Sequence, residues 1–190
     1  MITFKDLEKV NKDMEYTDIK GKNYAPCQER IKAFRKLFPT GYIKSDVLSD
    51  VDGVCIIKAE VGFNNIREDG INEEIILGEG IAYEREGSGF INKTSYIENC
   101  QTSAVARALG MAGFGIDESM ASAEEVANAT IQQNNKDYEK ATPSQIERIR
   151  KIYGDQVDKL LETQGVKKLE DIPLSKINEL LEKIGGKNNG

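Results

Sequence analysis

The sequence contains no histidine and only three cysteines. The lack of histidine excludes a Ser-His or Cys-His nucleophile pair and any zinc site with imidazole ligands. Three dispersed cysteines are too few for an all-thiolate zinc site. The chain also has no Walker A sequence and no G-x-G-x-x-G turn after a strand. We therefore expect a protein that is not an enzyme, with no catalytic residues, no metal and no cofactor.

A long apolar run is also missing. No stretch of about 18 apolar residues exists, which excludes a membrane-spanning helix. The first residues carry acids and lack the apolar segment of a secretory signal. Cys27, Cys55 and Cys100 are odd in number and widely spaced, which indicates buried free thiols in a reducing compartment rather than a redox role. We expect a cytoplasmic protein.

The charge is acidic overall but unevenly distributed. The net charge is −6, with 39% hydrophobic and 31% charged residues, as in an ordinary globular protein with a real core. Residues 1–135 hold 15 basic and 22 acidic side chains. The segment from Arg30 to Lys44 nevertheless has five basic residues and no acid. An acidic protein opposes nucleic-acid binding in general, but a local basic surface permits it.

The apolar periodicity predicts an α+β domain over residues 1–129. Helical spacing marks residues 2–15 and 24–38, and alternation marks strands at 42–51, 54–63 and 75–85. Asp52-Gly53 is a strong hairpin signal between the first two strands. A covering helix follows from Ser95. The expected fold is thus a helix, a three-stranded antiparallel β-sheet and a covering helix.

The helix from Ser95 has a marked start and end. Ser95 and Glu98 form a capping-box pattern, and the glycines at 110, 113 and 115 are expected to stop the helix. Its apolar stripe consists mostly of alanine, so a neighbouring element can approach closely. Gly78 and Gly80 in the third strand indicate a bulge, sharp coiling or a backbone that passes nearby. The stripe comprises Ile97, Gln101, Ala104, Val105, Ala108 and Ala112, while Asn99, Thr102, Ser103, Ala106 and Arg107 are assigned to the other side.

A second unit follows a polar linker expected at residues 130–141. Thr142, Pro143 and Gln145 have the pattern of a capped helix start. Residues 142–185 contain three short apolar-periodic segments and predict a small all-helical C-terminal module. Residues 186–190 are expected to form a disordered tail.

Several cations are candidate ligands for nucleic-acid phosphates. Lys32, Arg35 and Lys36 project from the polar face of the second helix, and Lys44 lies in the first strand. This face is either a solvated surface or a binding surface. Arg107 is either a snorkelling side chain or a phosphate contact. The loop with Phe90, Asn92 and Lys93 either contacts a strand by stacking and charge or simply connects two elements. The predicted DNA-binding set is Lys32, Arg35, Lys36, Lys44, Lys93 and Arg107; Arg30 lies nearer the apolar side and is expected to be structural.

The element order and the motif NCQTSAVARALGMAGFG resemble the single-strand annealing proteins of phages, of the Sak and Erf type, which are related to the Rad-fifty-two recombination mediator. In that family the helix after the sheet carries a pattern like T-x-A-x-x-R-A-L followed by glycine. Two positions depart from it, Ala106 and Gly110, where relatives often have a basic residue. The matching positions are Thr102, Ala104, Arg107, Ala108, Leu109 and Gly113.

The resemblance implies DNA recombination without ATP: a homo-oligomeric ring or filament binds single-stranded DNA with little sequence preference and anneals complementary strands. Basic side chains on a ring neutralise phosphates, and the ring multiplies weak contacts through effective concentration. The C-terminal module would then bind a phage or host recombination partner. The alternative is a protein–protein interaction subunit or host-nuclease modulator of the same fold that does not bind DNA, as the acidic balance suggests.

Overall fold

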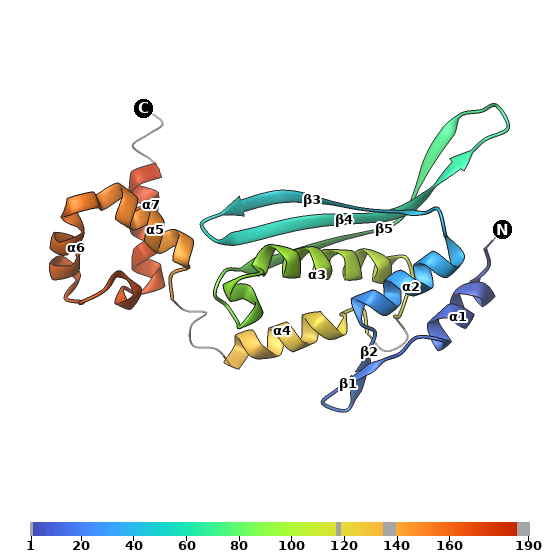
Figure 1. The fold of residues 1–190 in the computed structure, drawn as a ribbon, viewed down its shortest axis with the longest axis horizontal. Coiled ribbons are helices and arrows are strands. Elements are labelled where there is room, and N and C mark those ends of the chain that lie inside the picture. The colour runs from blue at the N-terminus through green and yellow to red at the C-terminus, as the bar shows by residue number, and fades with distance from the viewer. Residues whose placement is uncertain (1, 117–118, 135–139, 186–190) are drawn as a thin grey trace.

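The computed structural model describes residues 2–116, 119–134 and 140–185, and Figure 1 shows their arrangement. The α+β class expected from the sequence is confirmed: α2, three antiparallel strands and α3 form the main body, and helices follow it. The elements of the main body are α1 (Phe4–Lys12), β1 (Thr17–Ile19), β2 (Lys22–Tyr24), α2 (Cys27–Leu37), β3 (Tyr42–Val51), β4 (Val54–Ile66), β5 (Asn72–Arg85), η1 (Ile91–Lys93), α3 (Tyr96–Met111) and α4 (Ala123–Asn134).

The sheet has the strand order β3-β4-β5 and is antiparallel throughout. Asp52 and Gly53 both have positive φ angles, of 53° and 73°, which gives the predicted tight hairpin turn. A short antiparallel hairpin, β1–β2, lies between α1 and α2. One face of the sheet packs on α3, and the other face is not covered by any described helix (Figure 1).

The glycines of β5 allow α3 to lie directly against the sheet. A Cβ atom at Gly80 would lie 2.5 Å from the carbonyl oxygen of Ala104 and 2.5 Å from the amide nitrogen of Ala108. A Cβ at Gly78 would lie 2.4 Å from the carbonyl oxygen of Ala108. Of the three explanations for these glycines, the close passage of another backbone therefore applies to both.

A register shift between Val61 and Gly62 makes Leu77 an extra residue in β5. Because the shift reverses the alternation, Gly78, Gly80 and Ala82 face α3, while Ile81 and Tyr83 point outward. Strict alternation over residues 75–85 predicts instead that Ile81 and Tyr83 lie on the same face as Ile75 and Leu77. That assignment was wrong, and the two side chains are 56% and 62% exposed.

Helix α3 begins and ends close to the expected positions, but its start lacks the expected side-chain cap. Ser95 is the residue before the helix, yet its side chain makes no capping hydrogen bond. Gly110 continues the helix, and Gly113, with φ 95°, supplies the left-handed stop. The expected division of the helix into one apolar stripe and one other side was also wrong, because Asn99, Ser103 and Ala106, which were assigned to the other side, are buried too. The helix lies between the sheet on one side and α2 and α4 on the other (Figure 1).

Arg30 fastens the chain that follows α3. Its guanidinium is fully buried and donates five hydrogen bonds to backbone carbonyl oxygens, of which the shortest, to Ala106, is 2.7 Å. The structural role expected for Arg30 is confirmed. The other acceptors are the carbonyl oxygens of Gly115, Ser119, Met120 and Ala121.

The strands β4 and β5 extend beyond the predicted limits. The segment 64–73 was expected as a polar connection, but most of it continues the two strands, with a turn over residues 67–70. Strand β3 begins opposite Gly62, so residues 63–66 and 72–75 form a two-stranded hairpin without a third strand. This arm, defined as residues 63–75, projects from the body in Figure 1.

The C-terminal helices have a core of their own, distinct from that of the main body. Helix α4 extends into the expected linker as far as Asn134. Thr142 caps α5 with the predicted reciprocal bonds to Gln145. Contacts also cross the boundary: Thr142 Oγ1 donates to the carbonyl oxygen of Asp52 at 2.7 Å, and Arg148 pairs with the carboxylate of Asp52 at 2.5 Å. The C-terminal helices are α5 (Pro143–Tyr153), η3 (Gly154–Gln156), α6 (Val157–Gln164), η4 (Leu169–Asp171) and α7 (Leu174–Gly185).

Independence of the C-terminal module stays a prediction. The middle of the expected linker (135–139) and the expected tail (186–190) lie outside the described residues. All three cysteines are buried and free, as expected. Burial raises the pKa of the Cys27 and Cys100 thiols to about 12. Among the described helices, none combines the length and the apolar character needed to cross a membrane.

Candidate nucleic-acid interface

The predicted cations of α2 lie on its exposed face, but two of them already have carboxylate partners. Lys32 Nζ lies 2.5 Å from Oε1 of Glu29, and this hydrogen bond raises the pKa of Lys32. Lys36 lies 3.6 Å from Asp13. Arg35 donates to the carbonyl oxygen of Gly41 and has no carboxylate partner among the described residues. The helix thus carries less free positive charge than its sequence indicated.

Lys44 and Arg107 are also paired. Lys44 contacts Glu74 across the sheet, and this hydrogen bond raises the pKa of the lysine. Arg107 Nε lies 2.5 Å from Oε1 of Glu125, a side chain that is only 9% exposed. The guanidinium of Arg107 remains half-exposed beside the edge of β5. A phosphate could reach it only alongside, or in place of, this carboxylate.

The six predicted side chains come from four elements, and the described interactions join no two of them. Three lie on α2, and the others lie on β3, η1 and α3. Lys93 precedes α3, whereas Arg107 lies three turns into it. The predicted set therefore does not form one compact basic cluster around α3.

Lys93 differs from the other five because its ammonium group makes neither a hydrogen bond nor an ion pair with any described residue. It is exposed and ends η1, which Phe90 precedes. Phe90 is 85% exposed, the highest value among the exposed large apolar side chains of the described residues. An exposed aromatic ring three residues from an unpaired ammonium group can stack on a base while the lysine contacts a phosphate.

A buried polar network holds the base of this loop. Asn92 is 3% exposed, and its amide nitrogen donates to Oε2 of Glu84 at 2.6 Å and to Oγ of Ser88 at 2.7 Å. Its amide oxygen accepts from Asn99 at 2.8 Å, and Asn99 accepts in turn from Asn128 at 2.8 Å. Asn92 is therefore a structural residue, although the sequence analysis grouped it with the candidate strand contacts.

Glu84 is the charged end of this network. It is 6% exposed and accepts a second hydrogen bond, from Gln132 at 2.8 Å. Burial raises the pKa of the Glu84 carboxyl, although the bonds from Asn92 and Gln132 act in the opposite direction. Because the network joins β5, α3 and α4, the base of the loop is held from three sides.

Phe90 is absent from the predicted binding set, although its loop was singled out. The available signal was the sequence Gly-Phe-Ile-Asn-Lys between a glycine-containing turn and a helix start. That pattern does not tell whether the ring points outward. The partners of Asn92 decide this, and they lie on elements distant in the sequence.

Comparison with known proteins gives one family. Residues 31–112 match the family described as Slr1353 N-terminal dsRNA-binding domain-like. The match covers less than half of the chain and runs from the middle of α2 to the residue after α3. The chain is thus similar to this family over its helix–sheet–helix body. No curated protein matches the chain. The resemblance to phage annealing proteins stays a prediction.

Proposed function

We propose that this protein binds single-stranded nucleic acid, in particular single-stranded DNA, and anneals complementary strands as a homo-oligomer without ATP. The observation that carries the proposal is the loop on which Phe90 and Lys93 are exposed while Asn92 is locked in a buried network. Stacking on an aromatic side chain tolerates every base, so such a contact suits binding with little sequence preference.

The similarity of residues 31–112 to a dsRNA-binding-like family supports nucleic-acid binding in general. It also favours a second candidate, double-stranded RNA, which is recognised mainly by shape and by contacts to phosphates and 2′-hydroxyls. A third candidate, an interaction subunit without nucleic-acid binding, is favoured by the ion pairs of Lys32, Lys36, Lys44 and Arg107.

The proposal concentrates binding on a smaller surface than the sequence suggested. Phe90 and Lys93 provide the primary contacts, and Arg35 adds charge where the strand passes it. Lys32, Lys36, Lys44 and Arg107 contribute less, because their carboxylate partners oppose a phosphate. The C-terminal module binds a recombination partner in this proposal, and the protein acts in the cytoplasm of a bacterial host.

The test is a binding titration with single-stranded DNA, double-stranded DNA and double-stranded RNA of equal length at two salt concentrations. We expect the parent to prefer single-stranded DNA. Phe90→Ala removes one stacked base, worth about 1–3 kcal/mol, and should weaken binding by about 5- to 150-fold. Phe90→Tyr retains the ring and should bind like the parent. Lys93→Ala should reduce the salt slope by about 0.7 per protomer that contacts the strand.

Ile152→Ala on α5 and Lys151→Ala beside it are the matched controls, because both side chains are exposed on the C-terminal module. They should leave affinity unchanged. Tighter binding to double-stranded RNA that does not depend on Phe90 would favour the second candidate. Absence of binding to all three ligands at low salt would favour the interaction subunit.

A further inference from the structure

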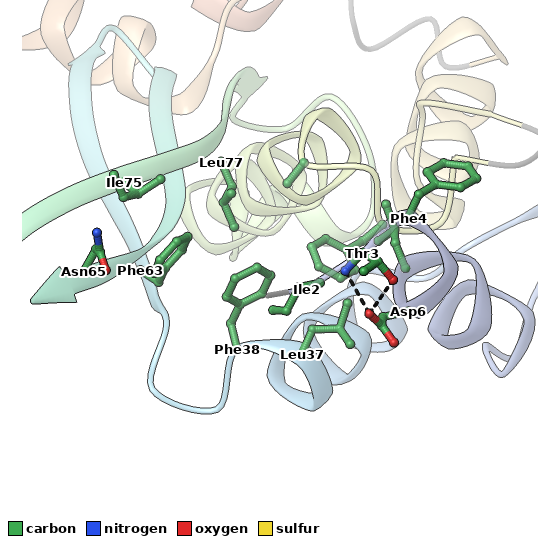
Figure 2. A pocket seen from close by; sticks show the side chains of 13 residues that line it. Ile2, Thr3, Phe4, Asp6, Leu37, Phe38, Phe63, Asn65, Ile75 and Leu77 are labelled. Carbon is green, nitrogen blue, oxygen red and sulfur yellow. Dashed lines mark hydrogen bonds between the residues drawn. The ribbon is translucent and has the colours of Figure 1, made fainter. Parts of the chain in front are cut away.

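A large apolar groove lies at the base of the arm, between α1, the end of α2 and the strands β4 and β5. Its volume is about 1050 Å³. Figure 2 shows the side chains of Leu37, Phe38, Phe63, Ile75 and Leu77 around it. The rings of Phe38 and Phe63 stack with their centres 5.2 Å apart. Ile2 and Phe4 stand at its mouth and are 41% and 78% exposed.

The tip of the arm carries an apolar pair that is not buried in its own chain. Ile66 is 76% exposed and Ile71 is 56% exposed, and they flank the turn that joins β4 to β5. A two-stranded hairpin is marginally stable in water without a third strand or a packed face. The four residues of β4 beyond Gly62 span about 13 Å, so the tip points away from the groove at its own base.

The groove and the arm also differ in charge. Residues 64–73 have one basic and three acidic side chains, a net charge of −2. Beside the groove, Lys5 and Arg35 have no carboxylate partner among the described residues and lie within two residues of the lining residues Phe4 and Leu37 in the chain. One carboxylate, Asp6, also lines the groove, and it accepts hydrogen bonds from Thr3. An acidic arm with an apolar tip therefore fits a groove with an apolar floor and unpaired cations at its border.

We propose that the groove binds the arm of a second copy of this chain, with Ile66 and Ile71 as the anchors. The contact is head-to-tail, because the donor uses its arm and the acceptor uses its groove. Such a contact repeats from copy to copy and generates a ring if the rotation closes and a filament if it does not. The inference rests on the oligomer of the proposed function but not on its binding of nucleic acid.

The experiment uses two variants of the full chain. The arm variant is Ile66→Asp with Ile71→Asp, and the groove variant is Ile2→Asp with Phe4→Asp. All four side chains are exposed in the single chain, so circular dichroism should show an unchanged fold. Loss of buried anchors at the centre of an interface weakens association on the order of 30-fold or more. Each variant alone should therefore be monomeric by light scattering at concentrations where the parent is oligomeric.

The decisive sample is an equimolar mixture of the two variants. One variant retains a normal groove and the other a normal arm, so a mixed pair has one intact contact. The mixture should give a mass twice the 21.1 kDa of one chain and no larger species. Ile152→Asp on α5 is the matched control and should assemble like the parent.

Three results would overturn the inference: a parent that stays monomeric up to about 0.5 mM, an arm variant with the parent's mass, or a mixture that remains monomeric. A monomeric parent would also refute the homo-oligomer of the proposed function, whereas the other two results leave nucleic-acid binding and the oligomer untouched. A parent that assembles through the arm but binds no nucleic acid refutes the proposed function alone. A parent that binds single-stranded DNA and assembles regardless of the arm refutes this inference alone.

Discussion

Replacement of Arg30 by methionine tests whether one buried guanidinium holds the main body together. Methionine retains much of the side-chain volume but removes five donated hydrogen bonds. Two of these hydrogen bonds, to the carbonyl oxygens of Ala106 and Gly115, are buried. In the variant both oxygens lose this donor while they remain buried.

The expected cost follows from the kind of bond that is lost. Leaving a buried polar group unsatisfied costs about 1–3 kcal/mol, and removing one member of a buried charged contact costs about 3–5 kcal/mol. Because methionine fills the space and some carbonyls can reach water, we expect a loss of about 3–5 kcal/mol in the free energy of unfolding. A domain of this size has about 5–15 kcal/mol in total.

Urea denaturation followed by circular dichroism measures this loss. With an m value of about 2 kcal/mol per molar, the midpoint should fall by about 2 M. Arg35→Met is the matched control, since Arg35 is exposed and donates to a single carbonyl oxygen, that of Gly41. Its midpoint should change by less than about 0.5 M. If Arg30→Met shifts the midpoint no more than Arg35→Met, the argument that Arg30 fastens the chain after α3 is wrong.

Two further predictions concern packing and pH. Gly80→Ala places a Cβ 2.5 Å from backbone atoms of α3, so the helix must move, and we expect a loss of about 1–3 kcal/mol in the free energy of unfolding. The control Asn65→Ala truncates an exposed side chain and should change the free energy of unfolding little. Burial raises the pKa of Glu84, so the folded state binds the Glu84 proton more tightly than the unfolded state does. The contribution of Glu84 to the free energy of unfolding therefore falls as the pH rises above the ordinary glutamate pKa. Glu84→Gln should therefore match the parent near pH 4 and become relatively more stable toward pH 7 in parallel denaturation series; a difference that is constant with pH would refute this account.

Local sequence signals determined the order of elements in this protein. The Asp52-Gly53 turn, the capping residue Thr142 and the alternation in the three strands all act between near neighbours in the chain. Such interactions depend on spacing alone, so they could be predicted. The small residues of α3 and β5 likewise predicted a close approach, because glycine and alanine leave room for another backbone.

Only the tertiary structure decided which faces and charges are available. One extra residue at Leu77 reverses the alternation in β5, and this exposes Ile81 and Tyr83. Carboxylates remote in the sequence neutralise Lys44 and Arg107, while Lys93 stays unpaired. A pattern of residue types cannot show these partners, because they come from elements that meet only when the chain folds. For the same reason Phe90 and the arm are recognised as candidate binding elements only in the folded molecule.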